Sequence, residues 1–336
     1  MLFSERVLSI EESGIRAIFN LVARSKDIIN LSIGEPDLDT PSFIKDAAKN
    51  ALDQGYTHYA PTKGYPDLLD AVALKLKKEN GIDVDPESEV MVAVGGTQAL
   101  YLALITLLRE GEEVLIPSPA FVAYYAATKL AGGVPIEVGL SEDYSIDPDN
   151  IRRSLTNRSR LLILNSPSNP TGAVSNAEKI KEAVSIAVEK GLMVISDEVY
   201  EKFIYEGKHF SPASIPEFKE HVVTVNSLSK AYAMTGWRVG YVAAPPEVIE
   251  QMAKVQMYSS ACIPSFIQKA AVEALHSQQS FFDDVIREYR RRRDALCSIL
   301  SECPYLSFKK PQGAFYLFPR LKGIETPSKE LVMRMI

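Results

Sequence analysis

The sequence has few cysteines, no long apolar run and no large excess of charge. Its three cysteines, Cys262, Cys297 and Cys303, do not have metal-ligand spacing, so we expect a reducing cytoplasm rather than a disulfide-rich fold. No apolar run is long enough to span a bilayer, and charges interrupt the first residues where a signal peptide is apolar. The net charge of −6 favours neither nucleic acid nor an anionic membrane as a partner.

The polar residues that often mark metal or nucleic-acid sites also lack the usual patterns. The four histidines show no ligand spacing, so we predict no metal site. The basic run Arg290–Arg293 has acidic neighbours on a helical pattern. We interpret it as a solvated helix face rather than a nucleic-acid site.

What the chain does have is a regular alternation of short apolar runs and helical patterns. Its 336 residues can form two domains, or one large domain with an appendage. The predicted strands are Val90–Val94, Glu113–Ile116, Val134–Val138, Leu161–Asn165, Met193–Ser196, Val222–Val225 and Val239–Ala243. The helical patterns between them are Gln98–Arg109, Ala123–Leu130 and Asn176–Lys190. This order predicts an α/β fold whose mostly parallel sheet is covered by helices on both faces.

The two ends of the chain follow a different pattern. We predict helices over Ser9–Lys26, from Pro246 to Leu275 and from Ser280 to Leu300, then strands Leu306–Phe308 and Ala314–Phe318. We therefore expect a large domain over residues 45–280 and a smaller α+β domain built from residues 1–44 and 281–336. A last helix with Ser328 as its N-cap stops at Ile336 after about two turns, so we expect the smaller domain to be incomplete.

Candidate ligand groups lie at or just after strand ends, where open α/β sheets bind ligands. Gly95 and Gly96 open a helix whose free N–H groups suit phosphate, although an ordinary turn has the same pattern. The loop from Asn165 to Gly172 presents Asn169, which is either a ligand group or part of a rigid turn. Asp197 is either a partner of a pyridinium nitrogen, a helix cap or a magnesium ligand.

Lys230 lies between small hydroxyl residues at another strand end. A lysine in such a place fits a buried nucleophilic amine, and Arg238 beside it supplies a planar fork suited to phosphate. Taken alone, a lysine is far more often a solvated surface charge. The chemical interpretation therefore depends on the whole set of strand-end residues.

The ordered motifs SPSNPTGAV, SDEVY and SLSKAYAMTGWRVG resemble those of class I/II aminotransferases. These enzymes have pyridoxal phosphate (PLP) fold type I and form the aspartate aminotransferase superfamily. The resemblance runs from about Leu31 to Phe318 and is closest to the prokaryotic aspartate and aromatic branch. It implies a large PLP-binding domain and a smaller second domain.

The resemblance implies roles for individual residues. Lys230 matches the lysine that forms the internal aldimine and moves the Cα proton, and Asp197 matches the partner of the cofactor's ring nitrogen. Asn169 and Tyr200 match hydrogen-bond partners of the cofactor's 3′-oxygen. Implied phosphate ligands are Gly96, Thr97, Gln98, Ser227, Ser229 and Arg238. Phe121 matches the aromatic that stacks on the ring, Gly34 matches a glycine near the substrate carboxylate, and Tyr59 matches a tyrosine that reaches the neighbouring subunit of a homodimer.

The implied reaction transfers an amino group from an L-amino acid, aspartate or aromatic, to a 2-oxo acid such as 2-oxoglutarate. Two alternatives remain open from the sequence: a PLP-dependent C–S β-lyase or related enzyme, and a non-catalytic PLP-binding sensor or interaction protein. The family also has an arginine for the substrate α-carboxylate beyond Gly313–Tyr316. No arginine of this chain is assigned that role, and we expect it in a longer chain.

Overall fold

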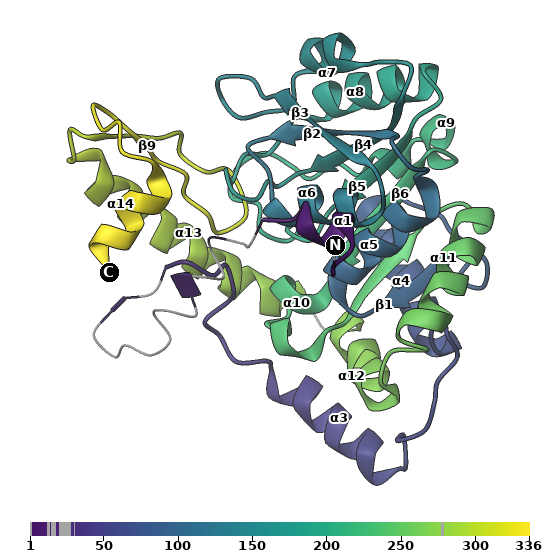
Figure 1. The fold of residues 1–336 in the computed structure, drawn as a ribbon. Helices are drawn as coiled ribbons and strands as arrows, with labels where there is room; N and C mark the ends of the chain where they lie inside the picture. The colour runs from purple at the N-terminus through teal and green to yellow at the C-terminus, as the bar shows by residue number, and fades with distance from the viewer. Residues whose placement is uncertain (1, 12–13, 15–17, 20–27, 30, 277–278) are drawn as a thin grey trace.

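A computed structural model describes the chain except residues 1, 12–13, 15–17, 20–27, 30 and 277–278. Its centre is a seven-stranded sheet in the order β1-β7-β6-β5-β4-β2-β3 (Figure 1). The strands are β1 (Val90–Ala93), β2 (Glu113–Ser118), β3 (Val134–Gly139), β4 (Ser159–Asn165), β5 (Met193–Asp197), β6 (Val222–Ser227) and β7 (Gly240–Ala243). All seven predicted strands are present, with ends shifted by at most two residues.

The sheet is parallel except at one strand. β7 runs antiparallel to both β1 and β6, whereas β3, β2, β4, β5 and β6 pair in parallel. β1, β6 and β7 are buried along their full length, as expected for a sheet with both faces covered. The predicted α/β class with a mostly parallel sheet is confirmed.

Helices cover both faces of the sheet (Figure 1). One face packs against α5 (Gly95–Leu107), α6 (Val122–Leu130) and α11 (Pro246–Ser259) through residues such as Ile116 and Ile163. Through residues such as Leu162 and Val194, the other face packs against α4 (Pro66–Lys75), α7 (Pro148–Ser154), α8 (Ala177–Glu189) and α12 (Ser265–Leu275). The short α9 (Pro216–Lys219) precedes β6, and α3 (Ser42–Asp53) packs its apolar face beside α12. Alternate residues of each strand thus enter opposite halves of the core.

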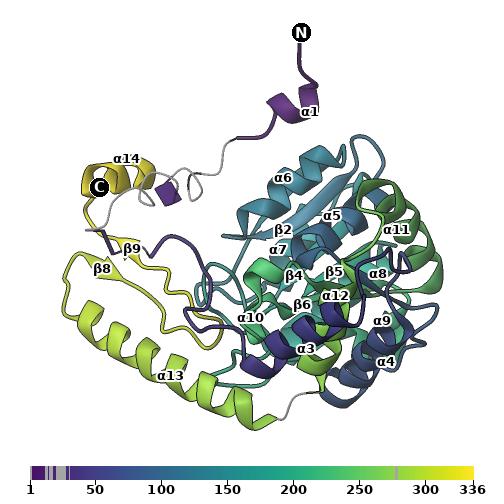
Figure 2. The same ribbon diagram turned by 90° about the horizontal axis from the view of Figure 1, so that it is seen from below.

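The C-terminal elements lie together at one side of this layered core (Figure 2). They are α13 (Gln279–Ser301), β8 (Leu306–Ser307), β9 (Arg320–Leu321) and α14 (Ser328–Met335). The helix predicted from Ser280 to Leu300 is confirmed by α13. In α14 the N-cap is Pro327, and Ser328 is the first helical residue, so the predicted cap was wrong by one position.

Two other predictions at this end were wrong. The helix predicted from Pro246 to Leu275 is two helices, because Ala261 has φ 59° and Pro264 begins the second as its N-cap. The strand predicted over Ala314–Phe318 is absent, and β8 pairs with Arg320–Leu321 instead. Ala314 has φ 52°, which breaks an extended run, so this segment turns toward the loop after β5.

The basic run also differs from its prediction as a solvated face. The Arg293 side chain is only 7% exposed and binds Glu206 and the Pro311 carbonyl. Arg290 donates to the Tyr205 carbonyl at 2.8 Å, whereas Arg291 forms an exposed ion pair with Glu288. Half of the run therefore anchors α13 to the loop that follows β5.

Two further predictions concern the N-terminal helix and membrane-spanning segments. Most of the helix predicted over Ser9–Lys26 lies outside the described residues. The described residues include α1 (Glu5–Leu8), which packs near α6. Among the described helices, none is long and apolar enough to cross a membrane.

Candidate active site at the carboxyl ends of the strands

The predicted ligand residues come from elements that end at the same edge of the sheet. Asn169 follows β4, Asp197 is the last residue of β5, and Lys230 lies in α10 (Leu228–Ala231) directly after β6. Because β4, β5 and β6 pair in parallel and in this order, their carboxyl ends are neighbours. Asn165 joins two of them, since its amide donates to the Asp197 carbonyl at 3.0 Å and its oxygen accepts from the Asn169 N–H at 2.8 Å.

The Lys230 amine points into the site and is not a solvated surface charge. Its Nζ donates to the Gly34 carbonyl at 2.6 Å. Burial lowers the pKa of Lys230, and Arg238 lowers it further against the opposing effects of Glu35 and Asp197. A lowered pKa leaves a larger fraction of the amine neutral, which is the nucleophilic form.

Asp197 is held by a residue that sequence reasoning did not identify. The Tyr124 hydroxyl donates to Asp197 Oδ2 at 2.6 Å, and the Val199 N–H donates to Oδ1 at 3.2 Å. Burial raises the pKa of Asp197, while the hydrogen bond from Tyr124 opposes that rise. Burial also raises the pKa of Tyr124 well above its usual value, so this residue remains a donor. The only signal in the sequence was its position three residues after Phe121, on the same side of α6.

Tyr200 contacts a second residue that sequence reasoning left without a role. Its hydroxyl lies 2.5 Å from the Tyr316 hydroxyl, and Asn169 also forms a hydrogen bond with Tyr200. Burial raises the pKa of Tyr200 well above its usual value, and burial raises the pKa of Tyr316 to about 12. A Cβ on Gly34 would lie 2.2 Å from the Tyr316 hydroxyl, so only glycine fits beside this pair. The contact of Tyr316 with Tyr200 spans 116 residues, so no local pattern in the sequence indicates it.

A cradle for an anion lies at the start of α5. Gly95 has φ 75°, and a Cβ there would lie 2.6 Å from Arg238 Nη2. A Cβ on Gly240 would lie 2.8 Å from the Gly96 nitrogen. These close approaches bring the guanidinium of Arg238 to the helix N-terminus, where free N–H groups and the helix dipole favour negative charge.

Some predicted ligand side chains have partners within the protein. Ser227 caps α10, accepting from the Ser229 N–H at 3.1 Å, and its hydroxyl donates to Ser229 Oγ at 2.8 Å. The Gln98 side chain accepts from the Val94 N–H at 2.6 Å, which leaves its backbone as the group that faces the cradle. Thr97 is exposed at the same helix end.

Two predicted aromatic residues occupy different environments. Phe121 is the N-cap residue of α6 and packs edge-on against Tyr124, with ring centroids 5.6 Å apart. It therefore packs on the residue that donates to Asp197. Tyr59 is 88% exposed, so the side chain points away from the core of its own subunit.

The donor set at this edge fits PLP. A cationic fork and a helix N-terminus suit its phosphate, a buried carboxylate suits a protonated ring nitrogen, and a buried amine suits its aldehyde. The fit rests on the approach of Arg238 to Gly95 and on the Asp197–Tyr124 and Lys230–Gly34 contacts. Arg238 beside Gly95, the Lys230 amine and the Asp197 carboxylate thus lie at the same edge of the sheet.

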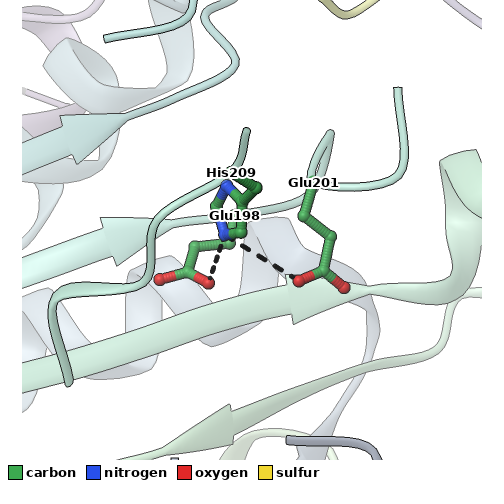
Figure 3. A group of neighbouring side chains, drawn as sticks. All are labelled: Glu198, Glu201 and His209. Carbon is green, nitrogen blue, oxygen red and sulfur yellow. Dashed lines mark hydrogen bonds and ion pairs between the residues drawn. The ribbon is translucent and has the colours of Figure 1, made fainter. Parts of the chain in front are cut away.

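A buried polar cluster lies behind the same strand end. Glu198 and Glu201, the neighbours of Asp197 and Tyr200, face His209 (Figure 3). His209 Nε2 lies 2.9 Å from Glu198 Oε2 and 4.0 Å from Glu201 Oε2. Burial alone would lower the pKa of His209, but Glu198 and then Glu201 outweigh it and raise that pKa.

The chain already supplies cationic and donor groups to these carboxylates. The Lys75 ammonium pairs with Glu201, and the Asn80 amide donates to Glu201 at 2.6 Å and to Glu198 at 3.1 Å. Although the carboxylates and His209 lie close enough to hold an ion, we interpret the group as an internal ion network. Sequence reasoning missed it because Lys75 and Glu201 are 126 residues apart.

Comparison with known proteins agrees with this geometry. Residues 26–335 match the family model described as aminotransferase class I and II. The chain is 48% identical to an aspartate aminotransferase of Pyrococcus abyssi, over 100% of this chain and 87% of the relative. It is 46% identical to an aromatic-amino-acid aminotransferase of Thermococcus litoralis, with the same coverage. A solved aspartate aminotransferase from Thermus thermophilus, a single mutant, is similar with a TM-score of 0.94 and 40% identity, over 100% of this chain and 89% of that one.

Proposed function

This chain belongs to the class I and II aminotransferases, and from that premise we propose that its amino donor is aspartate or an aromatic amino acid. The activity itself, amino transfer with PLP, is that of the family. The proposed donors are supported by the names of the similar proteins, which include aspartate, aromatic and aspartate/prephenate aminotransferases. We propose 2-oxoglutarate as the acceptor.

The observation that carries the site assignment is the half-buried Lys230 amine, which donates to the Gly34 carbonyl. When bound, PLP supplies an electron sink for the negative charge that develops at the substrate's Cα. Lys230 would hold the cofactor, and its free amine would be the group that accepts the substrate's Cα proton and later donates it back. Its lowered pKa suits both tasks, because each one needs a neutral amine.

The other residues orient the cofactor and control its charge in this proposal. The Asp197 carboxylate, oriented by Tyr124, holds a proton on the ring nitrogen. Tyr200 and Asn169 would bind the 3′-oxygen, and Phe121 would stack on the ring. The N–H groups of Gly96, Thr97 and Gln98, together with Ser227, Ser229 and Arg238, would hold the phosphate. The substrate's α-carboxylate would bind near Gly34, which packs so closely on Tyr316 that a Cβ there would lie 2.2 Å from the Tyr316 hydroxyl.

A panel of amino donors with 2-oxoglutarate tests the proposed specificity. We expect aspartate or an aromatic amino acid to have a kcat/KM at least about 10-fold above that of alanine, a difference of about 1.4 kcal/mol in transition-state binding. Glutamate without an acceptor should convert the bound cofactor to its pyridoxamine form. Release of pyruvate and ammonia from cysteine conjugates, without that form, would instead support the β-lyase alternative.

We also propose that two copies of the chain form a homodimer with shared active sites. Tyr59 and Tyr258 are 88% and 90% exposed. Their segments adjoin, since Gln256 donates to the Thr62 carbonyl at 2.6 Å and the Ala60 N–H approaches Cys262 Sγ at 3.4 Å. Ser260 binds Gln98 at 3.0 Å, so this exposed aromatic surface lies beside the proposed phosphate cradle.

Sedimentation of the holoenzyme tests the homodimer. We expect a dimer at micromolar concentration, because large exposed aromatic side chains beside a ligand site are typical of an interface. Tyr59→Phe should keep the dimer but weaken PLP binding about 3- to 10-fold, the loss of one hydrogen bond to a charged group. An active monomer would contradict the proposal.

We propose that residues 45–280 form the large domain and that residues 1–44 and 281–336 form the smaller one. In support, the sheet and its covering helices lie within the first range, except for the first three residues of α3 (Ser42–Asp53). The elements from α13 onward lie at one side of that core (Figure 2). Gly34 and Tyr316 then belong to the smaller domain, and both meet large-domain residues at the site.

A further inference from the structure

Tyr316 is the residue of the site whose hydroxyl has no role in the proposed function. It comes from the C-terminal part of the chain, 116 residues from Tyr200, yet the two hydroxyls lie 2.5 Å apart. Their rings are edge-on, with centroids 5.4 Å apart. Tyr200 is only 5% exposed, so the contact is shielded from solvent.

The backbone around Tyr316 fixes where its hydroxyl lies. Ala314 is fully buried with φ 52°, and its carbonyl accepts a hydrogen bond from Tyr205. A Cβ on Gly313 would lie 2.6 Å from the Phe203 carbonyl, so this segment is seated tightly on the loop after β5. On its other side the Tyr316 ring approaches Gly34, the residue whose carbonyl accepts from Lys230.

The donor order between the two hydroxyls follows from proton count. A tyrosine hydroxyl has one proton to donate, and its oxygen can accept. If Tyr200 gives its proton to the cofactor's 3′-oxygen, the short contact with Tyr316 must use the Tyr316 proton. A hydroxyl that accepts one hydrogen bond becomes a stronger donor in the next, because the chain polarises cooperatively.

We propose that Tyr316 is a positioning residue whose hydroxyl donates to Tyr200 and so directs the single Tyr200 proton toward the 3′-oxygen of PLP. This inference rests on the proposed binding of PLP at Lys230. High pKa values for both phenols support it, because both hydroxyls stay protonated across the working pH range. Tyr316 acts through Tyr200 and needs no contact with the cofactor.

Tyr316→Phe removes the hydroxyl and keeps the ring. Weaker donation from Tyr200 leaves more negative charge on the 3′-oxygen, which favours the protonated form of the bound chromophore. We expect the pH midpoint of the cofactor's absorbance change to rise by about 0.3–1 unit. This is the range expected when part of the free energy of one hydrogen bond reaches the 3′-oxygen through Tyr200. A spectroscopic pH titration of the holoenzyme measures this midpoint without using turnover.

Two further variants separate this role from simple packing. Tyr205→Phe removes another hydroxyl that holds the same segment, and it should lower thermal stability without moving the midpoint. In Tyr200→Phe the midpoint should rise more than in Tyr316→Phe, and the double variant should match Tyr200→Phe alone. An unchanged midpoint in Tyr316→Phe, an equal shift in Tyr205→Phe, or full additivity in the double variant would each overturn the inference. If wild-type protein with PLP shows no absorbance band, the proposed function fails instead.

Discussion

Lys230→Ala is expected to lower kcat/KM for the amino donor by about 10⁴-fold or more, because both covalent attachment and the Cα proton acceptor are lost. The holoenzyme spectrum should lose the band that depends on a bond between lysine and cofactor. Borohydride reduction of wild-type protein should place the cofactor's mass on the peptide that contains Lys230. In the variant that adduct should be absent.

Lys181→Ala is the matched control for a general loss of lysine charge. Lys181 forms an ion pair with Glu178 at 2.9 Å on α8, outside the site. We expect its spectrum and kcat/KM to match the wild type, since surface pairs contribute little. Retention of the adduct in Lys230→Ala, or its loss in Lys181→Ala, would show that the reactive amine is elsewhere.

Lys230→Ala lowers activity but is not expected to destabilise the apoprotein. Burial lowers the pKa of Lys230 below its unfolded value, so the folded state binds fewer protons than the unfolded state below that unfolded value. The contribution of Lys230 to the free energy of unfolding therefore rises with pH toward about 10.4, the ordinary pKa of lysine. Lys230→Ala should be at least as stable as wild type at pH 7, and its advantage should shrink as the pH approaches 10. Thermal unfolding of the two apoproteins across this range measures the trend.

The strands were predictable because burial on both faces leaves a local signal. Runs such as Leu161–Asn165 and Met193–Ser196 are short and apolar, and each was found within two residues of its predicted ends. The strand-end residues Asn169, Asp197 and Lys230 followed from the same signal, because parallel order gathers strand ends at one edge. The strand predicted at Ala314–Phe318 failed because the positive φ of Ala314 depends on tertiary contacts with the loop after β5.

The contacts that orient the site were not predictable from local pattern. Tyr124 lies 73 residues from Asp197, and Tyr316 lies 116 residues from Tyr200. A hydrogen bond between such distant residues leaves no periodicity in the sequence, so these tyrosines look like ordinary core aromatics. His209 likewise shows no ligand spacing, yet the fold brings it to 2.9 Å from Glu198. The sequence thus predicted the candidate cofactor residues at the strand ends but not the side chains that bind them, such as Tyr124 at Asp197.

Lys75→Met is expected to lower the free energy of unfolding by about 3–5 kcal/mol at pH 7, because it leaves buried carboxylates without their permanent cation. The Lys75 side chain is 5% exposed and pairs with Glu201, and its ammonium also lies 3.5 Å from Glu79 and 2.7 Å from Asn80. Lys77→Met is the matched control, since Lys77 and Asp83 pair at 3.0 Å with side chains 64% and 77% exposed. The control should change the free energy of unfolding by less than about 1 kcal/mol.

The pH dependence of this loss identifies its cause. Burial alone would raise the pKa of Glu201, but Lys75, then His209, outweigh it and hold the pKa at about 2. Since this is below the unfolded value of about 4.3, the pair stabilises the fold above that pH and is lost as pH falls toward 2. Without Lys75, burial raises the pKa of Glu201 above its unfolded value, so the variant should lose stability as pH rises from 4 to 7.

Urea unfolding of wild type and Lys75→Met at pH 4 and pH 7 therefore gives the decisive comparison. The difference in free energy of unfolding should be smaller at pH 4, where the unpaired carboxyl can take up a proton. Adding Glu201→Gln to Lys75→Met should recover part of the loss at pH 7, because it removes the unpaired charge. A difference that is equal at both pH values, with no recovery in the double variant, would mean that Lys75 contributes packing rather than charge.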